Sequence, residues 1–189
     1  MDLDEEYGPC LPFERSASEA EMSVMPRSVQ ILDDTTAPAL KAYLESASDL
    51  RVPQVLHATT PLLWLIDVDG KLRFALEEVL ARDTGQVSYI LPRNGPPMRE
   101  TDVRLGHPAL LEPVGPGQMK SARIGGEIFY DPVVTSPNAW VLTNNSGRFG
   151  KRPHLTRKHL ENAKAAFARF DIYVRAFFIY TPPRTGERP

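Results

Sequence analysis

The centre of the fold is decided by the sequence Pro61-Leu62-Leu63-Trp64-Leu65-Ile66-Asp67-Val68-Asp69-Gly70-Lys71-Leu72-Arg73-Phe74-Ala75-Leu76. Two apolar runs flank an Asp-Gly pair, the pattern typical of a β-hairpin. The first run, Leu62–Ile66, is continuously apolar and predicts a strand covered on both faces. The second run, Leu72–Leu76, alternates and predicts a strand with one apolar face. We therefore expect this hairpin at the middle of a sheet, with Glu77 and Glu78 at its exposed end.

The segments on either side of the hairpin predict further strands and two helices. A helix is expected after Thr35 or Thr36, with Pro38 in its first turn, and a second, amphipathic helix from Thr156 to Phe170. Residues 92–118 contain many prolines and are expected to be mostly loop. The expected strands are Ser28–Leu32, Val87–Leu91, Ser121–Tyr130, Trp140–Thr143 and Ile172–Tyr180. Together these segments predict an α+β fold, a mainly antiparallel sheet flanked by two or three helices.

The length of 189 residues favours one domain with a sizeable core. Residues 1–26 are rich in acidic residues and poor in aliphatic ones, which predicts a disordered or loosely attached tail. We expect the globular domain over residues 27–182 and a short C-terminal tail over residues 183–189.

The charge is distributed unevenly. Residues 1–25 hold seven acidic residues and one arginine, whereas residues 148–189 hold ten lysines or arginines and three acidic residues. Such runs are usually solvated surfaces. The alternative hypothesis is that the acidic segment rests on a basic site and weakens the access of anionic ligands.

Several classes of protein are excluded or disfavoured by motifs that the sequence lacks. It has neither an apolar run long enough to span a membrane nor a signal peptide, so a cytoplasmic location, or export without a cleaved signal, is expected. Cys10 is the single cysteine, which excludes an internal disulfide. The nucleophile elbow, the phosphate-binding loop, the dinucleotide fingerprint and the zinc-protease motif are all missing, and we expect no metal site.

Polar residues gather where the strand Trp140–Thr143 ends. Asn144, Asn145, Ser146 and Arg148 follow that strand directly, and Arg152 lies a few residues further on. Small polar side chains with a guanidinium group suit an anionic ligand, although the same residues are common turn formers.

Three more polar residues are expected beside this group. Pairing of the two strands after residue 120 predicts Glu127 near the Trp140 end and Arg123 near the Asn144 end, with His107 supplied by the preceding loop. The candidate catalytic residues are therefore Glu127, His107 and Ser146. The candidate ligand-binding residues are Arg123, Asn144, Asn145, Arg148 and Arg152.

The order of these motifs resembles a poorly characterised module of plant IQ-motif calmodulin-binding proteins and of bacterial effector and toxin domains. The module has a His-Ser-Ser segment, an Ala-Gly-Glu strand and an Asn-x-Ser-Gly-His-Tyr segment before an amphipathic helix. The matching residues here are 106–111, 124–128, 143–149 and the helix from Thr156. The chain differs where Arg148-Phe149 replaces His-Tyr and where Pro108-Ala109 replaces Ser-Ser.

Through its bacterial members this resemblance extends to mono-ADP-ribosyltransferases and implies NAD as the cofactor. In that reading Arg148 or Arg123 holds the diphosphate, Asn145 and Ser146 orient the ribose, and Glu127 stabilises the developing oxocarbenium ion. The Glu-x-Glu motif usual in those enzymes does not occur in this chain.

Two other functions remain open at this point. One is a non-catalytic module, an immunity or adaptor protein that binds a protein partner through the same polar residues. The other is binding or cleavage of nucleic acid by the basic C-terminal segment, with His107 as acid or base, which the sequence pI of about 6.1 disfavours.

Overall fold

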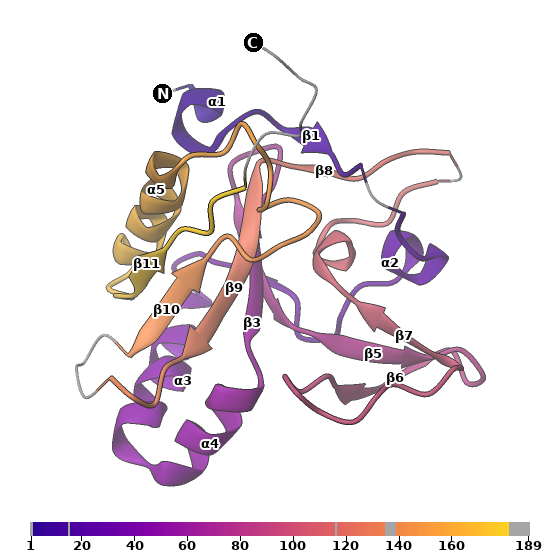
Figure 1. Ribbon diagram of the computed structural model, residues 1–189, viewed down its shortest axis with the longest axis horizontal. Helices are drawn as coiled ribbons and strands as arrows, with labels where there is room; N and C mark the ends of the chain where they lie inside the picture. Colours follow the sequence, from indigo (N-terminus) through magenta and orange to yellow (C-terminus); the bar gives the residue numbers. More distant parts are fainter. Residues whose placement is uncertain (1, 15, 116, 135–138, 182–189) are drawn as a thin grey trace.

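A computed structural model describes residues 2–14, 16–115, 117–134 and 139–181. The fold is α+β, with a six-stranded sheet whose strand order is β11-β10-β9-β3-β4-β2 (Figure 1). All neighbouring strands in it are antiparallel except β10 and β11, which are parallel. These strands are β2 (Gln30–Ile31), β3 (Leu62–Ile66), β4 (Leu72–Leu76), β9 (Ile124–Tyr130), β10 (Trp140–Thr143) and β11 (Arg175–Phe177).

The predicted hairpin is confirmed as the middle of this sheet. Strand β3 pairs with β4, with Trp64 opposite Phe74, and all five residues of β3 are buried. Alternate residues of β3 point to opposite faces, so the strand contributes to two cores. Trp64 packs edge-on against Phe167 on one face, while Leu63 and Leu65 belong to the core on the other face.

Different elements cover the two faces of the six-stranded sheet. The core that contains Trp64 is closed by helices α3 (Ala37–Asp49) and α5 (Arg157–Ala168). Both helices were predicted, and Thr156 caps the start of α5. The core that contains Leu63 is closed by the 3₁₀ helix η1 (His107–Leu110), by Phe149 and by the N-terminal segment. A further helix, α4 (Arg51–Thr59), follows α3.

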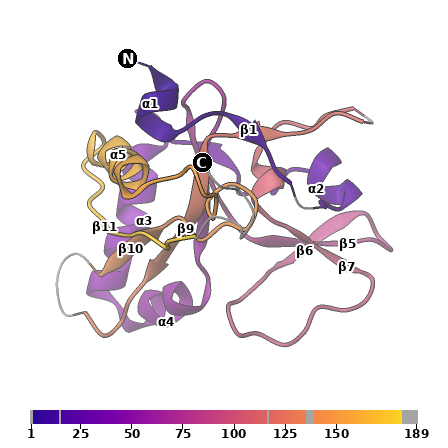
Figure 2. The ribbon, with the colours of Figure 1, turned by 45° about the horizontal axis from the view of Figure 1, so that its top comes forward.

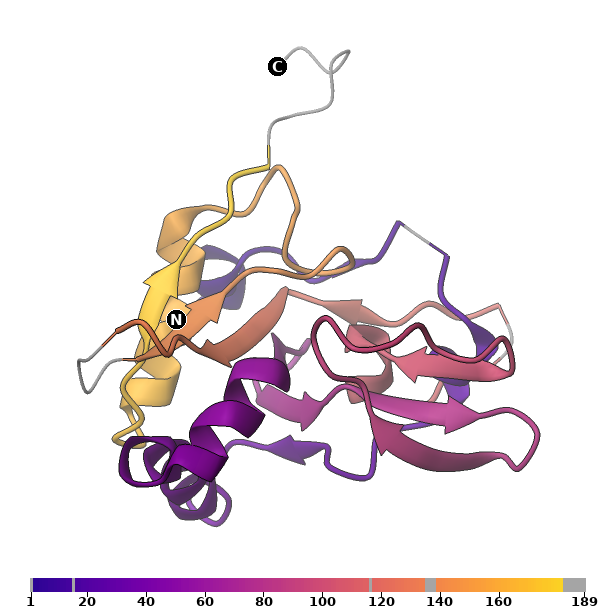
Figure 3. The same ribbon diagram turned by 60° about the horizontal axis from the view of Figure 1, so that its bottom comes forward.

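A second, three-stranded sheet leaves the hairpin directly after Glu77 (Figure 3). Its order is β6-β5-β7, formed by Gln86–Ile90, Glu78–Ala81 and Asp102–Leu105. The prediction of an exposed Glu78 was wrong, because this carboxylate is buried and accepts hydrogen bonds from the Arg27 and Ser28 backbone N–H groups. Strand β7 and helix η1 also lie inside the predicted loop 92–118. They were missed because each is only four residues long.

The N-terminal segment is packed on the domain and is not the tail expected over residues 1–26 (Figure 2). It forms α1 (Leu3–Tyr7), β1 (Leu11–Pro12) and α2 (Glu19–Ser23). Strand β1 pairs with β8 (Ser121–Ala122). The physical reason is that two of its few large apolar side chains, Tyr7 and Phe13, are buried. Two buried aromatic side chains attach the segment to the domain although its average hydropathy is low.

The C-terminal strand is shorter than predicted. Only β11 forms a ladder, parallel to β10, and the expected tail over residues 183–189 lies outside the described residues.

Candidate functional site

The pairing of β9 with β10 sets where the polar residues lie. Glu127 is opposite Thr143, so it lies at the Asn144 end of the ladder. The expected placement of Glu127 at the Trp140 end was wrong, because Tyr130 pairs with Trp140 and Glu127 therefore lies three residues along, at Thr143. The Asn145 side-chain amide therefore donates to Glu127 Oε2 at 2.9 Å, and Arg93 forms an ion pair with the same oxygen.

Two more carboxylates lie beside Glu127, at the junction of the two sheets. Glu77 connects β4 to β5, and Glu21 comes from α2, which packs on η1. Gly106 lies between them: a Cβ added to it would be 3.0 Å from Glu21 Oε1 and 3.8 Å from Glu77 Oε1. A side chain at position 106 would therefore crowd the Glu21 carboxylate and touch that of Glu77.

Each of the three carboxylates has an arginine partner. Besides the Arg93–Glu127 pair, Arg148 Nη2 lies 3.6 Å from Glu21 Oε2, and Arg104 Nη1 lies 3.7 Å from Glu77 Oε1. We call this group the Glu127 cluster. Its members are Glu21, Glu77, Arg93, Arg104, His107, Glu127, Asn145 and Arg148. With three acidic and three basic groups it is nearly neutral, in contrast to the cationic site expected from the sequence.

The protonation of two groups in the cluster is perturbed. Burial raises the pKa of Glu77, and the charges of Glu127 and Glu21 raise it further, against the opposing effect of Arg104. Burial lowers the pKa of His107, so its imidazole is held neutral. Groups with displaced pKa values that gather around opposite charges are typical of functional sites.

His107 is hydrogen-bonded to the backbone of β9. Its Nε2 donates to Gly126 O at 2.9 Å, and the ring is buried. Gly126 itself has no room for a side chain, because a Cβ would lie 1.8 Å from Thr143 O. Gly126 thus lets β9 approach β10 closely, and His107 ties the same residue to η1, immediately before Glu127.

Asn144 and Ser146 form a turn and face inward. The Asn144 amide donates to Gly150 O and Ile179 O, and its Oδ1 accepts from Ile179 N. Ser146 Oγ accepts from the backbone N–H groups of Arg148 and Phe149. The polar atoms of both side chains are therefore hydrogen-bonded to the backbone of the domain.

Arg123 and Arg152 bind the N-terminal segment. Arg123 forms an ion pair with Asp4 and donates to Gly8 O and Val68 O. Arg152 donates to four backbone carbonyls, those of Arg148, Ala122, Leu11 and Pro12. Neither guanidinium group belongs to the Glu127 cluster.

The structure thus brings together four of the predicted site residues: Glu127, His107, Asn145 and Arg148. Four members of the cluster were not predicted from the sequence: Glu21, Glu77, Arg93 and Arg104. The Glu-Glu pair after the hairpin was the one local signal for Glu77.

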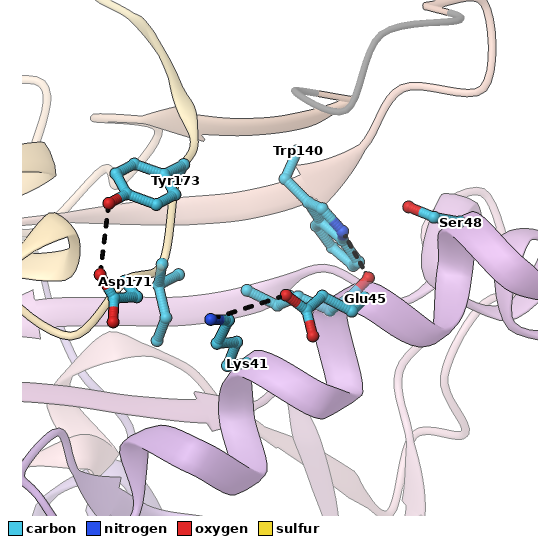
Figure 4. Close-up of a pocket in the computed structure, with 8 residues that line it drawn as sticks. Lys41, Glu45, Ser48, Trp140, Asp171 and Tyr173 are labelled. Carbon is cyan, nitrogen blue, oxygen red and sulfur yellow. Dashed lines mark hydrogen bonds and ion pairs between the residues drawn. The ribbon is translucent and has the colours of Figure 1, made fainter.

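A separate cavity of about 220 Å³ lies beside Trp140, and Figure 4 shows the residues that line it. The Tyr173 hydroxyl donates to Asp171, and Lys41 lies 3.9 Å from Glu45. The Glu127 cluster is the stronger candidate site, because it combines three carboxylates with a raised pKa at Glu77 and a buried Arg148 Nη1 that has no partner among the described residues.

Two kinds of feature are absent from the described residues. No three His, Cys, Asp or Glu side chains there are grouped so that they could hold a metal ion. No helix in that part of the chain has the length and apolar character needed to cross a bilayer.

Comparisons of the chain with family models, curated proteins and solved structures found no match.

Proposed function

We propose that this protein is an effector- or toxin-like domain that binds an anionic nucleotide at the Glu127 cluster and cleaves its glycosidic bond. NAD is the candidate substrate, and ADP-ribose is the group transferred. The observation that carries the proposal is the Glu127 carboxylate, held by Asn145 and Arg93 near the half-buried Glu77.

The chemistry requires a carboxylate that faces a developing positive charge. When the bond between ribose and nicotinamide breaks, its electron pair leaves with nicotinamide and the ribose becomes an oxocarbenium ion. Glu127, oriented by two donors, supplies the negative charge that stabilises this ion. The hydroxyl group of water or of an acceptor then attacks the ribose carbon and gives its proton to a base. Glu77 suits that role, because a carboxylate with a raised pKa is a stronger base.

Arginine side chains supply contacts for the diphosphate. Arg148 Nη1 is buried and has no hydrogen-bond partner in the described structure, which is costly for a charged group. A phosphate oxygen would satisfy it, and Arg93 offers a second, more exposed guanidinium group.

The test measures nicotinamide release and label transfer from NAD labelled in its adenylate phosphate, with and without cell lysate. We expect turnover by the wild type and a loss of about 100-fold in Glu127→Gln, the usual effect of removing one electrostatic contact to a transition state. Glu100→Gln is the matched control, because Glu100 is exposed and outside the cluster. If the wild type neither consumes NAD nor transfers label, the enzymatic proposal fails.

One observation favours a protein-binding module as the second candidate function. Four apolar side chains at and just before α4 are exposed: Leu50, Val52, Val55 and Leu56. Such a stripe on a short helix is typical of a surface that contacts another protein. Under this alternative Val55→Asp weakens partner capture, and Glu127→Gln leaves it unchanged.

A further inference from the structure

The N-terminal segment contacts Arg148 of the Glu127 cluster from two sides, with Phe13 and with Glu21. On the first side, Arg152 donates to Leu11 O and Pro12 O, and Phe13 packs edge-on against Phe149 with ring centroids 5.8 Å apart. The Arg148 guanidinium lies over the Phe13 ring at 5.3 Å. The arginine that would bind a diphosphate is therefore covered by the N-terminal segment.

On the second side, helix α2 places a carboxylate against the same arginine. Glu21 is 4% exposed, and its Oε2 lies 3.6 Å from Arg148 Nη2. The orientation of Glu21 is fixed by a capping box, in which its carboxylate accepts from Ser18 N at 2.9 Å. A carboxylate is the side-chain group most similar in charge and geometry to a phosphate oxygen pair.

The backbone at the same residue is held by a buried lysine. Lys120 Nζ donates to Glu21 O at 2.8 Å and also to Pro108 O and Leu111 O. Residue 21 is thus bound twice, through its carboxylate by Arg148 and through its carbonyl by Lys120.

We infer that residues 16–24 form an autoinhibitory strap whose Glu21 carboxylate occupies the anion subsite of Arg148. The inference rests on the proposed function, in which Arg148 binds the phosphate groups of the ligand. A phosphate group must displace the Glu21 carboxylate before it reaches Arg148. The free energy of ligand binding is therefore weakened by the free energy of the Glu21–Arg148 ion pair. Lys120 holds the backbone of the strap at Glu21 O, so a ligand that competes for Arg148 first displaces the Glu21 side chain.

The experiment compares binding of inorganic pyrophosphate to the wild type, Glu21→Gln and Glu19→Gln by isothermal titration calorimetry. Glutamine keeps the capping box, so α2 is expected to stay folded in Glu21→Gln. Glu19 lies on the same helix and is exposed, which makes Glu19→Gln a control for the loss of one negative charge. We expect roughly two- to fivefold tighter binding in Glu21→Gln, the size expected for release of one ion pair that is partly exposed at Arg148, and wild-type binding in Glu19→Gln.

Two further measurements complete the test. Adding Arg148→Gln to Glu21→Gln should abolish the gain, and saturating pyrophosphate should speed hydrogen exchange of the α2 amides in the wild type. Equal affinity in Glu21→Gln and wild type, no binding by either, or an equal gain in Glu19→Gln would overturn the strap.

The strap and the enzymatic proposal fail separately. A gain in pyrophosphate affinity without NAD turnover keeps the strap and removes the glycosidic reaction. NAD turnover without any gain in Glu21→Gln keeps the reaction and removes the strap.

Discussion

The adjacent residues Asn144 and Asn145 should respond to alanine substitution in opposite ways. Asn144 is 1% exposed, and its side chain makes three hydrogen bonds, at 3.0 Å to Gly150 O, 3.0 Å to Ile179 O and 2.6 Å from Ile179 N. At about 1 kcal/mol for each bond, Asn144→Ala should lower the free energy of unfolding by about 3 kcal/mol. The Asn145 side chain makes one bond at a partly exposed position, to Glu127, so Asn145→Ala should cost less than about 1 kcal/mol.

Urea unfolding followed by tryptophan fluorescence measures both variants, because Trp64 and Trp140 are buried in the native state. NAD turnover should show the reverse order, with Asn145→Ala impaired and Asn144→Ala active below its unfolding midpoint. If both substitutions lowered the free energy of unfolding equally, and the slope of that free energy against urea concentration were unchanged, the reasoning would be refuted. Asn144 could then not be assigned to the fold and Asn145 to the site.

Three other substitutions test the packing around the cluster. Gly126→Ala should prevent folding or cost about 4 kcal/mol or more, because its Cβ would overlap Thr143 O; a soluble variant with a wild-type thermal midpoint would contradict this. Burial lowers the pKa of His107 in the folded protein below its ordinary value of 6.5. As the pH falls through about 6.5, the imidazole is therefore protonated in the unfolded chain before it is protonated in the folded protein. The free energy of unfolding consequently decreases below that pH. The free energy of unfolding of His107→Gln should therefore fall less than that of the wild type between pH 7 and pH 5, and parallel profiles would exclude a buried neutral imidazole. Lys120→Met should cost about 1–3 kcal/mol in urea unfolding, because Glu21 O and Leu111 O lose their ammonium donor; a cost near zero would show that water replaces it.

The sequence predicted the parts of the fold that depend on local patterns. The hairpin around Asp69-Gly70 and the helix after Thr156 were confirmed, because turn chemistry and apolar periodicity are both local. Strand β7 and helix η1 were missed, because four residues carry too little periodicity to separate them from loop.

The candidate site was harder to predict, for two physical reasons. Asn144 and Ser146 have the side chains that both turns and ligand sites use, and only the contacts with Gly150, Ile179 and Phe149 separate the two roles. Glu21 comes from the N-terminal segment, which is distant in sequence from the rest of the cluster and whose average composition predicts a solvated tail.

The pairing of distant segments also affects how the chain folds as it leaves the ribosome. Strand β3 is buried between β4 and β9, yet the residues of β9 are synthesised about sixty positions later, and Glu6 O receives a hydrogen bond from Asn162, 156 positions away. The nascent chain therefore lacks the partner for one edge of its most apolar strand while about sixty further residues are synthesised. We expect native structure to form late, and ribosome-bound chains that end before β9 to need chaperone protection.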